Sequence, residues 1–384
     1  MTASVDVIIV GAGSIGLPTA FFLAREGVKV LVVDRLPSHG QGQNKAAIGG
    51  VRATHSDPAK IQTCQLSLEV FGRWRDEYGD DIHFARGGYC FPVYEEEHEW
   101  SLKNLLVIQK KYGLDIDWLD AGELARLVPG LNPEGLRGGT YSPGDGSVSP
   151  MLASSAFYRQ ALARGAAFSF GEKVTAIVRS GGSFSVRTDK NTYSAAKVII
   201  AAGADAREVG RLVGLDLPVF PDSHEAGVTE PVTPFFRPMV VDIRGYPGST
   251  NFYFYQEEQG HVIFCLTPEP IIPGHNRDSS SGFLPQAARR MISLFPRMRN
   301  LRVRRVWRGL YPMTPDGVPI VDRFPDGDGL YVAVGFCGQG LMMGPGIARN
   351  LVSLVTTGKP AIAEEVFRSF SLARDYDRPS EALK

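Results

Sequence analysis

The first 34 residues hold a complete β-α-β motif with a glycine-rich turn. A strand pattern over residues 5–10 leads directly into GAGSIG at 11–16. A helical run over 17–26 and a second strand over 28–33 follow, and Asp34 stands 23 positions after the first glycine. This order predicts a Rossmann-like fold that binds a dinucleotide across the turn.

Each part of the motif has a physical task. Gly11 permits the tight turn after the strand, Gly13 leaves room for a pyrophosphate beside the backbone, and Gly16 lets the helix pack closely on the sheet. The helix N-terminus presents unpaired N–H groups and the positive end of its dipole to the phosphates. We expect Asp34 to accept hydrogen bonds from ribose hydroxyls.

Composition narrows the class of protein. With 384 residues the chain can form two cores of ordinary size, at roughly 150 residues per domain. Its 41 basic and 41 acidic residues cancel, which gives no electrostatic case for nucleic acid or an anionic membrane. No C-x-x-C pair occurs among the four cysteines, so a disulfide scaffold, a zinc site or an iron–sulfur cluster is not expected. The first strand begins close to Met1 and no apolar run reaches transmembrane length, so we expect a cytoplasmic protein without a signal peptide or membrane span.

The character of the sequence alternates along the chain, which predicts two interleaved domains. Glycine-rich segments return near Tyr141 and after Trp307, whereas aromatic and β-branched residues dominate 220–307 and predict an antiparallel sheet. The expected fold class is α/β, with an α+β second domain. We assign the nucleotide-binding domain to 1–85, 141–217 and 308–384, and the substrate-binding domain to 86–140 and 218–307.

A second glycine-rich turn lies near the C-terminal end. A strand pattern over 330–334 is followed by GFCGQGLMMGP at 335–345, which opens a helix, and the segment before it reads WRGLYPMTPDGVPI at 307–320. A glycine turn between a strand and a helix again places N–H groups and a positive dipole end at a cofactor.

With these motifs the chain resembles the D-amino-acid oxidase superfamily of FAD-dependent oxidoreductases, and most closely its sarcosine oxidase and proline dehydrogenase β-subunit branch. The resemblance covers nearly the whole chain and is carried by the first motif, the strand end AAG at 201–203, and the segments 309–320 and 335–345. It implies a Rossmann-like FAD-binding domain of the glutathione-reductase type beside an antiparallel-sheet substrate domain. It also implies hydride transfer to flavin N5 from the carbon beside an amine, which requires a deprotonated amine but no strong catalytic base.

The resemblance places an extended FAD along the first domain. Adenosine is expected at Asp34 and Arg35, pyrophosphate along 11–16, and the isoalloxazine at Gln43, Asn44 and 338–342. NAD is the main alternative for the first site, but a simple NAD dehydrogenase has no use for the second glycine turn or the interleaved domains. The expected cofactor-binding residues are Gly11, Gly13, Ser14, Ile15, Gly16, Asp34, Arg35, Gln43, Asn44, Val174, Gly203, Gly309, Gly338, Gln339, Gly340, Leu341 and Met342.

Two residues are candidates for contact with the substrate near its carboxylate. Arg52 matches a carboxylate-binding arginine of sarcosine oxidases, and a guanidinium group binds a carboxylate through two parallel hydrogen bonds. The alternative for Arg52 is a structural ion pair with an acid such as Asp57. Tyr311 stands where glycine oxidases and D-amino-acid oxidases carry a carboxylate-binding arginine, and sarcosine oxidases also have a tyrosine there.

Further cavity residues are expected among the aromatic strands. Tyr253 and Tyr255 are expected on opposite faces of one strand, with Tyr253 in the cavity as a third catalytic candidate and Tyr255 in ordinary packing. His224 and His261 are expected to be structural histidines that are satisfied by hydrogen bonds.

Three departures from monomeric sarcosine oxidases bear on the chemistry. Gly309 aligns with the cysteine that tethers their flavin, so FAD is expected to be non-covalent. Met342 aligns with a carboxylate-binding lysine, and no lysine occurs between Lys197 and Lys359, where those oxidases place a lysine that activates oxygen. A cation near the flavin stabilises developing superoxide. Its absence favours a dehydrogenase, and Met342-Met343 resembles the proline dehydrogenase β subunits, which pass electrons onward.

The expected activity is FAD-dependent oxidation of a secondary or N-substituted amino acid to an imine that hydrolyses. Proline-, hydroxyproline-, sarcosine- and opine-like compounds are the candidate substrates, and the partner is a second subunit or an electron-acceptor protein. Two alternatives stay open: a hydrogen-peroxide-forming amino-acid or glycine oxidase, and a non-catalytic flavin-binding subunit of a larger complex. An NADPH-dependent hydroxylase is unsupported, because Gly335-Phe336 replaces the Gly-Asp pair that is usual in that class.

Overall fold

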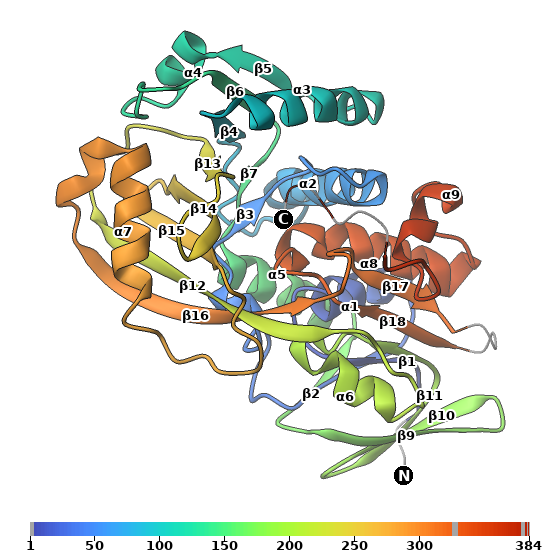
Figure 1. Cartoon of the computed structure of the whole chain (residues 1–384). Coiled ribbons are helices and arrows are strands. Elements are labelled where there is room, and N and C mark those ends of the chain that lie inside the picture. The colour runs from blue at the N-terminus through green and yellow to red at the C-terminus, as the bar shows by residue number, and fades with distance from the viewer. Residues whose placement is uncertain (1–3, 325–328, 378–380, 382, 384) are drawn as a thin grey trace.

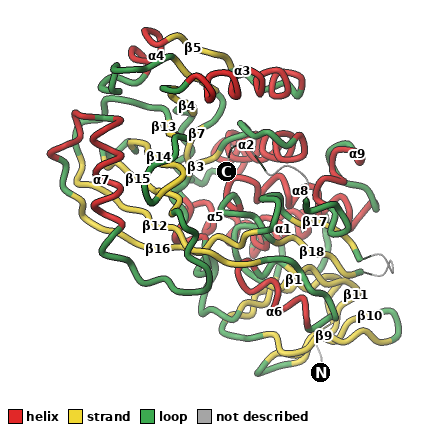
Figure 2. Tube along the Cα trace, in the orientation of Figure 1, coloured by secondary structure: helices red, strands yellow, loops and turns green. Residues whose placement is uncertain are grey.

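The computed structural model describes residues 4–324, 329–377, 381 and 383 (Figure 1). Most of the strands in these residues belong to two eight-stranded sheets, and two more form a small separate ribbon, β3 (Gly50–Val51) with β7 (Gly146–Ser147). Figure 2 shows helices gathered beside the first sheet and other helices beside the second. Within the described residues, no helix is both long and apolar enough to cross a lipid bilayer.

The first sheet is the predicted Rossmann-like sheet. Its order is β17-β18-β11-β1-β2-β8, and all neighbours are parallel except β17 and β18. An antiparallel extension adds two strands beside β11. The strands are β1 (Ser4–Val10), β2 (Val30–Asp34), β8 (Ala167–Phe170), β9 (Val174–Ser180), β10 (Ser183–Thr188), β11 (Thr192–Ile200), β17 (Ile320–Arg323) and β18 (Leu330–Val334).

Strand β1 is buried on both faces, as a central parallel strand must be. Val7 and Ile9 enter one hydrophobic core, and Ile8 and Val10 enter another on the opposite face. The first core is closed by α1 (Gly16–Arg25), α2 (Pro58–Tyr78), α5 (Pro150–Leu162) and α8 (Gly340–Thr357), whose side chains interdigitate.

The second sheet has the order β16-β12-β15-β14-β13-β4-β6-β5 and is antiparallel except where β13 meets β4. Helix α7 (Phe283–Leu294) covers one face over a phenylalanine-rich core, while α3 (Glu96–Lys111) and α4 (Ala121–Leu127) lie near β5 and β6 (Figure 1). The strands are β4 (Tyr89–Val93), β5 (Asp117–Asp120), β6 (Gly138–Ser142), β12 (Phe220–Pro231), β13 (Met239–Asp242), β14 (Ser249–Gln256), β15 (His261–Pro268) and β16 (Val303–Met313).

A parallel sheet with helices and an antiparallel sheet are therefore both present, and the expected fold class is confirmed. The division into domains remains a prediction. Strand β16 runs through the boundary proposed at 307–308 and carries the chain without a break from the second sheet to the cavity described below.

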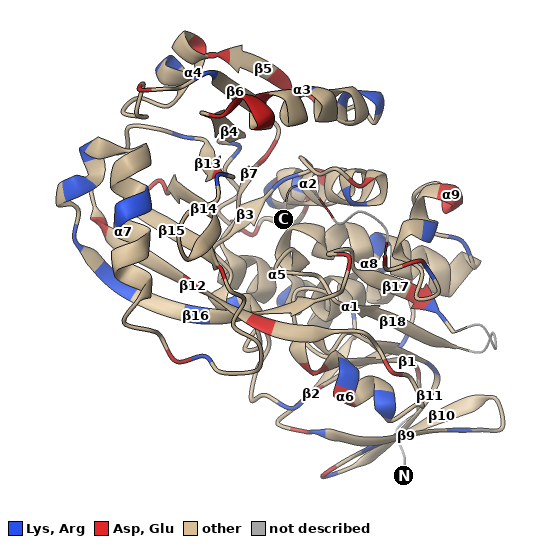
Figure 3. Cartoon of the chain, in the orientation of Figure 1, with Lys and Arg blue, Asp and Glu red and all other residues tan. Residues whose placement is uncertain are grey.

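Basic and acidic residues are equal in number over the whole chain but not within every segment. Residues 279–315 contain eight arginines and no acidic residue, and the ribbon of α7 and of the first part of β16 is marked blue at several of them (Figure 3).

Candidate functional site

A cavity of about 840 Å³ is lined by residues of both sheets. This volume lies in the upper part of the range of about 300–1,000 Å³ typical of small-molecule sites. All the residues predicted for the cofactor and the substrate line it except Gly16, so the fold brings together positions as distant in sequence as Gly11 and Met342.

The first glycine turn is closely packed on one side and open on the other. A Cβ atom at Gly11 would overlap the carbonyl oxygen of Ala201, and one at Gly16 would overlap that of Gly11. A Cβ at Gly13, in contrast, would meet no protein atom within 4 Å. Gly16 therefore packs the helix against the turn, which explains its absence from the cavity wall, and Gly13 borders free space.

The N-terminus of α1 has donors to offer. The first N–H group of the helix that donates to a preceding backbone carbonyl is that of Leu17, which donates to the carbonyl of Gly13 at 3.0 Å. Within the described parts of the chain, the N–H groups of Gly13, Ser14 and Ile15 donate to no protein acceptor, and α1 has no side-chain cap. Unpaired N–H groups at a helix N-terminus form an anion site.

Asp34 braces the same turn. Its carboxylate accepts hydrogen bonds from the N–H of Ala12 at 2.7 Å and of Leu36 at 2.8 Å. Burial raises the pKa of Asp34, and these two donors oppose the rise. Carboxylate oxygens have further lone pairs, so the side chain remains able to accept from a ligand in the cavity. Arg35 pairs with Asp205 at 2.8 Å across this end of the cavity.

Side-chain hydrogen bonds fasten the loop around Gln43 and Asn44 to its surroundings. Gln43 accepts from the N–H of Leu310 at 2.8 Å, Asn44 donates to the carbonyl of Pro150 at 3.0 Å, and Trp307 donates to the carbonyl of Ala46 at 2.9 Å. Gln43 and Asn44 line the cavity, and the hydrogen bonds described here join their side-chain amides to the protein backbone.

The second glycine turn faces the first. Cys337 and Gly338 have positive φ values of 49° and 80°, and a Cβ at Gly338 would overlap the ring of Tyr311. A Cβ at Gly340 would lie 3.1 Å from Oγ of Ser14. The start of α8 therefore approaches the start of α1, and both helix N-termini are directed at one cavity.

The cavity wall formed by the second sheet contains a pair of tyrosines. The hydroxyls of Tyr253 and Tyr311 lie 2.6 Å apart. Burial raises the pKa of both hydroxyls well above the ordinary value, so both tyrosines are neutral hydrogen-bonding groups.

The expectation that Tyr253 and Tyr255 point to opposite faces is wrong. Residues two apart on a regular strand share a face, and both tyrosines pack in one cluster. They differ in depth along the strand: Tyr253 lines the cavity, whereas the hydroxyl of Tyr255 donates to the carbonyl of Ile48 at 2.6 Å.

Arg52 lines the cavity, and its guanidinium group donates to the backbone carbonyls of Thr54 and Leu383. The alternative pairing with Asp57 does not form, because Asp57 caps α2 and accepts from Ser369. No carboxylate among the described residues forms an ion pair with Arg52, so this buried cation keeps donors for another anion.

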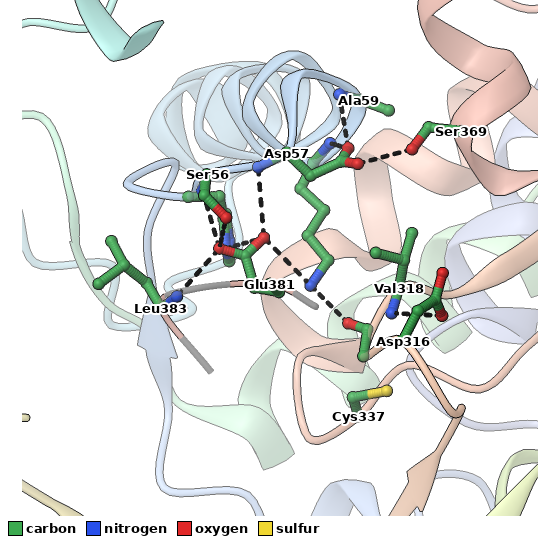
Figure 4. A network of polar contacts seen from close by, with 12 residues as sticks. Ser56, Asp57, Ala59, Asp316, Val318, Cys337, Ser369, Glu381 and Leu383 are labelled. Atoms are coloured by element: carbon green, nitrogen blue, oxygen red, sulfur yellow. Dashed lines mark hydrogen bonds and ion pairs between the residues drawn. The ribbon is translucent and has the colours of Figure 1, made fainter. Parts of the chain in front are cut away.

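Glu381 belongs to a buried ionic network with residues of the segment around Ser56 (Figure 4). Glu381 accepts from the N–H of Ser56 at 2.8 Å and from its hydroxyl at 2.6 Å, and it lies 3.5 Å from Nζ of Lys60. Burial alone would raise the pKa of Glu381, but Lys60, His55 and Ser56 hold it well below its usual range. Burial lowers the pKa of His55 well below its usual range.

Several cavity residues were missed in the sequence. Asp222, Asn251, Cys265 and Thr267 line the cavity from the second sheet. The two-residue period of a strand is the signal that could have found them, because positions two apart on β12, β14 and β15 face the cavity together.

Comparison with known proteins places the chain in a family. A family model described as FAD dependent oxidoreductase, DAO, matches residues 6–354. The chain belongs to the DAO family of FAD-dependent oxidoreductases. The residues present fit the cofactor, since unpaired N–H groups at the first turn and two facing helix N-termini border the free space.

Relatives of this DAO-family oxidoreductase include proteins with different substrates in their names. A glycine oxidase of Geobacillus kaustophilus (strain HTA426) is 29% identical over 90% of this chain and 91% of its own length. A sarcosine oxidase subunit beta of Rhizobium meliloti (strain 1021) is 27% identical over 94% of this chain and 87% of its own. The crystal structure of L-proline dehydrogenase from P. horikoshii superposes with a TM-score of 0.89 at 26% identity, covering 97% of this chain and 98% of that one.

Proposed function

We propose that this oxidoreductase oxidises a secondary or N-substituted amino acid of the proline, hydroxyproline, sarcosine or opine type. The observation that carries the proposal is the tyrosine pair in the cavity wall: Tyr311, in place of an arginine, with its hydroxyl 2.6 Å from that of Tyr253. Two neutral hydroxyls can hydrogen-bond to a bulkier, N-substituted substrate. A second guanidinium group in their place would instead require a negative charge on the substrate. Two of the relatives above carry sarcosine and L-proline in their names.

Each proposed role belongs to a named group of residues. Gly13 to Ile15 would hold the pyrophosphate, the start of α8 would lie beside the flavin, and Arg52 would bind the substrate carboxylate. Tyr253 and Tyr311 would orient the substrate through hydrogen bonds. The bound FAD supplies the hydride acceptor, and the protein supplies binding, orientation and exclusion of water.

The proposal is tested by identifying the product. Purified protein, an artificial dye and each candidate amino acid are incubated together, and dye reduction is followed alongside trapping of the imine or detection of the oxo acid. Equal amounts of reduced dye and imine-derived product with a secondary amino acid support the proposal. Dye reduction by glycine alone would contradict it and favour a glycine oxidase-like enzyme, the second candidate suggested by the G. kaustophilus relative.

The FAD is expected to be non-covalent. Gly309 carries no nucleophile, and a Cβ at this position would lie 2.8 Å from Cβ of Ala46, so the wall is closed to a tethering side chain there. Precipitation with acid should release all the flavin into the supernatant. Flavin that stays with the denatured protein in a gel would contradict this.

Arg52→Ala should weaken transition-state binding by about 2–4 kcal/mol, as when the partner of a buried charge is removed. The measurement is kcat/KM with the best amino acid, together with thermal unfolding, because Arg52 also donates to Thr54 and Leu383. Arg52→Lys keeps the charge without the two-pronged geometry and should recover part of the loss. An unchanged kcat/KM in Arg52→Ala would remove this residue from the substrate site.

Electron transfer to a dye or a protein acceptor is expected to be much faster than to oxygen. Arg308, the arginine nearest in sequence to the cavity segment of β16, is neutralised by Glu225 at 2.7 Å, with both side chains buried. It therefore does not replace the missing lysine as a free cation. Stopped-flow reoxidation of reduced enzyme by air-saturated buffer is compared with reoxidation by a quinone. Oxygen as the faster acceptor would make the protein an oxidase.

The name of the Rhizobium meliloti relative designates a subunit. A partner subunit for this chain is therefore part of the proposal, and a non-catalytic flavin-binding subunit remains its alternative. A protein that reduces the dye by itself would exclude that alternative.

A further inference from the structure

The backbone carbonyl of Leu383 is in contact with the guanidinium group of Arg52 and has no role in the function proposed above. Arg52 donates from Nη1 to the carbonyl of Thr54 and from Nη2 to that of Leu383. Both contacting residues are buried, with exposed fractions of 6% for Arg52 and 4% for Leu383. A guanidinium group has further N–H donors beyond these two, and Arg52 lines the cavity. The side chain is therefore held from one side and can still bind a ligand.

The buried carboxylates of this region are directed at other partners. Asp145 accepts from the hydroxyl of Thr54, and Glu381 lies 3.5 Å from Nζ of Lys60. In the part of the chain that the structure describes, neither of them forms an ion pair with Arg52, and both hydrogen-bond acceptors of Arg52 are neutral carbonyls. The positive charge of Arg52 is thus not cancelled by an anion of the protein.

The place of the Leu383 carbonyl is fixed by the rest of its residue. The N–H group of Leu383 donates to Glu381 at 3.1 Å (Figure 4). Its side chain packs in a hydrophobic cluster with Phe91 and Met239, and the guanidinium carbon of Arg52 lies 5.8 Å from the centroid of the Phe91 ring. The carbonyl is therefore a fixed group and can orient the guanidinium group that donates to it.

The neutrality of this acceptor has a physical consequence. A guanidinium group binds a carboxylate through two parallel hydrogen bonds only when its plane is correctly oriented. A carboxylate of the protein could provide this orientation, but it would also form the ion pair that a ligand is meant to form. A carbonyl provides the orientation and leaves the charge available.

We propose that Leu383 is a positioning residue, whose backbone carbonyl orients Arg52 and leaves its positive charge for the substrate carboxylate. This inference rests on the proposed function, in which Arg52 binds that carboxylate. It follows that a negative charge placed at this carbonyl should form an ion pair with Arg52 and compete with the substrate.

The test is a chain that ends at Leu383, made by deleting Lys384. The deletion converts the carbonyl of Leu383 into a terminal carboxylate and alters no other group that contacts Arg52. Pyrrole-2-carboxylate is titrated into the oxidised holoenzyme, and binding is followed by the absorbance of the flavin. The dissociation constant should rise on the order of tenfold in the shortened chain, because the ligand must displace a carboxylate that is tethered in place. The neutral pyrrole-2-carboxamide should bind both proteins equally.

Two further variants show whether the effect acts through Arg52. Lys384→Ala removes the same side chain but keeps a neutral carbonyl at Leu383, so it should bind pyrrole-2-carboxylate like the unaltered protein. Arg52→Ala should bind this ligand weakly. Shortening the chain in the Arg52→Ala background should then have no additional effect, because the ion pair cannot form.

Steady-state kinetics with the best amino acid give an independent measurement. In the shortened chain KM should rise by the same factor while kcat stays close to that of the unaltered protein, because saturating substrate displaces the terminal carboxylate. General damage to the fold would instead lower kcat or release FAD.

Unchanged affinity for pyrrole-2-carboxylate in the shortened chain would overturn the role of Leu383. An equal further loss in the Arg52→Ala background would also overturn it. Arg52→Ala that binds pyrrole-2-carboxylate as tightly as the unaltered protein would instead remove Arg52 from the proposed function, and this inference with it.

Discussion

Glu381→Gln is expected to lower the free energy of unfolding by about 3–5 kcal/mol. The substitution keeps the shape of the side chain but leaves Lys60 as an uncompensated buried charge, and removing one partner of a buried pair has a cost of this size. Both side chains are fully buried, 3.5 Å apart. Denaturation with urea measures the effect as a shift in midpoint at constant slope.

The matched control is Glu364→Gln. Glu364 and Arg368 also form an ion pair, at 3.9 Å, but both side chains are largely exposed. Exposed pairs contribute at most about 1 kcal/mol, so this variant should unfold close to the unaltered protein. Equal midpoints for Glu381→Gln and Glu364→Gln would show that the buried network contributes nothing.

The same network gives stability a defined dependence on pH. The pKa of Glu381 is lowered in the folded state, so its contribution is fully present above the ordinary value of 4.5 and is lost as pH falls through the folded value. The pKa of His55 is also lowered, from 6.5, so the unfolded chain binds more protons below that pH. Both terms make the protein less stable in acid. In Glu381→Gln the part of this loss that begins near pH 4.5 should be absent.

Gly13→Ala is expected to weaken FAD binding without unfolding the protein. A Cβ at Gly13 meets no protein atom within 4 Å, so the only clash is with the pyrophosphate proposed to lie there. An added methyl group in a packed site costs roughly 1–3 kcal/mol, which corresponds to a fall in affinity of about five- to 150-fold. Fluorescence titration of apoprotein with FAD measures this.

Gly144→Ala serves as the control for that experiment. A Cβ at Gly144 also meets open space, and the residue does not line the cavity. FAD affinity should be unchanged in it, and thermal unfolding of both apoproteins should match the unaltered chain. If Gly13→Ala bound FAD as tightly as Gly144→Ala, the pyrophosphate would have to lie elsewhere.

Local sequence patterns predicted the parts of the site that depend on backbone geometry. The turn at 11–16 needs glycine where the backbone is crowded, at Gly11 and Gly16, and where the turn borders the cavity, at Gly13, and the structure shows these surroundings. The facing turn at 335–345 was predicted in the same way, from a strand, a glycine-rich turn and a helix in sequence. Such motifs can be recognised in the sequence because the residues that define them lie on one strand, one turn and one helix that follow one another along the chain.

Features that depend on packing between distant segments were not predictable in this way. The contact of Arg52 with Leu383 joins residues 331 positions apart, and no local pattern encodes it. The stacking of His224 on Tyr311 depends on the pairing of β12 with β16. The placement of Tyr253 and Tyr255 on opposite faces failed for a simpler reason, since the two-residue period of a strand puts them on one face.

The measurement that most directly tests this account is anaerobic bleaching of the bound flavin by a panel of amino acids. The panel contains sarcosine, both enantiomers of proline and of hydroxyproline, an opine, glycine and D-alanine, each mixed with oxidised enzyme in the absence of oxygen. We expect rapid loss of flavin absorbance with at least one secondary or N-substituted amino acid, and slow or no loss with glycine and D-alanine. Fastest bleaching by a primary amino acid, or no bleaching by any member of the panel, would contradict it.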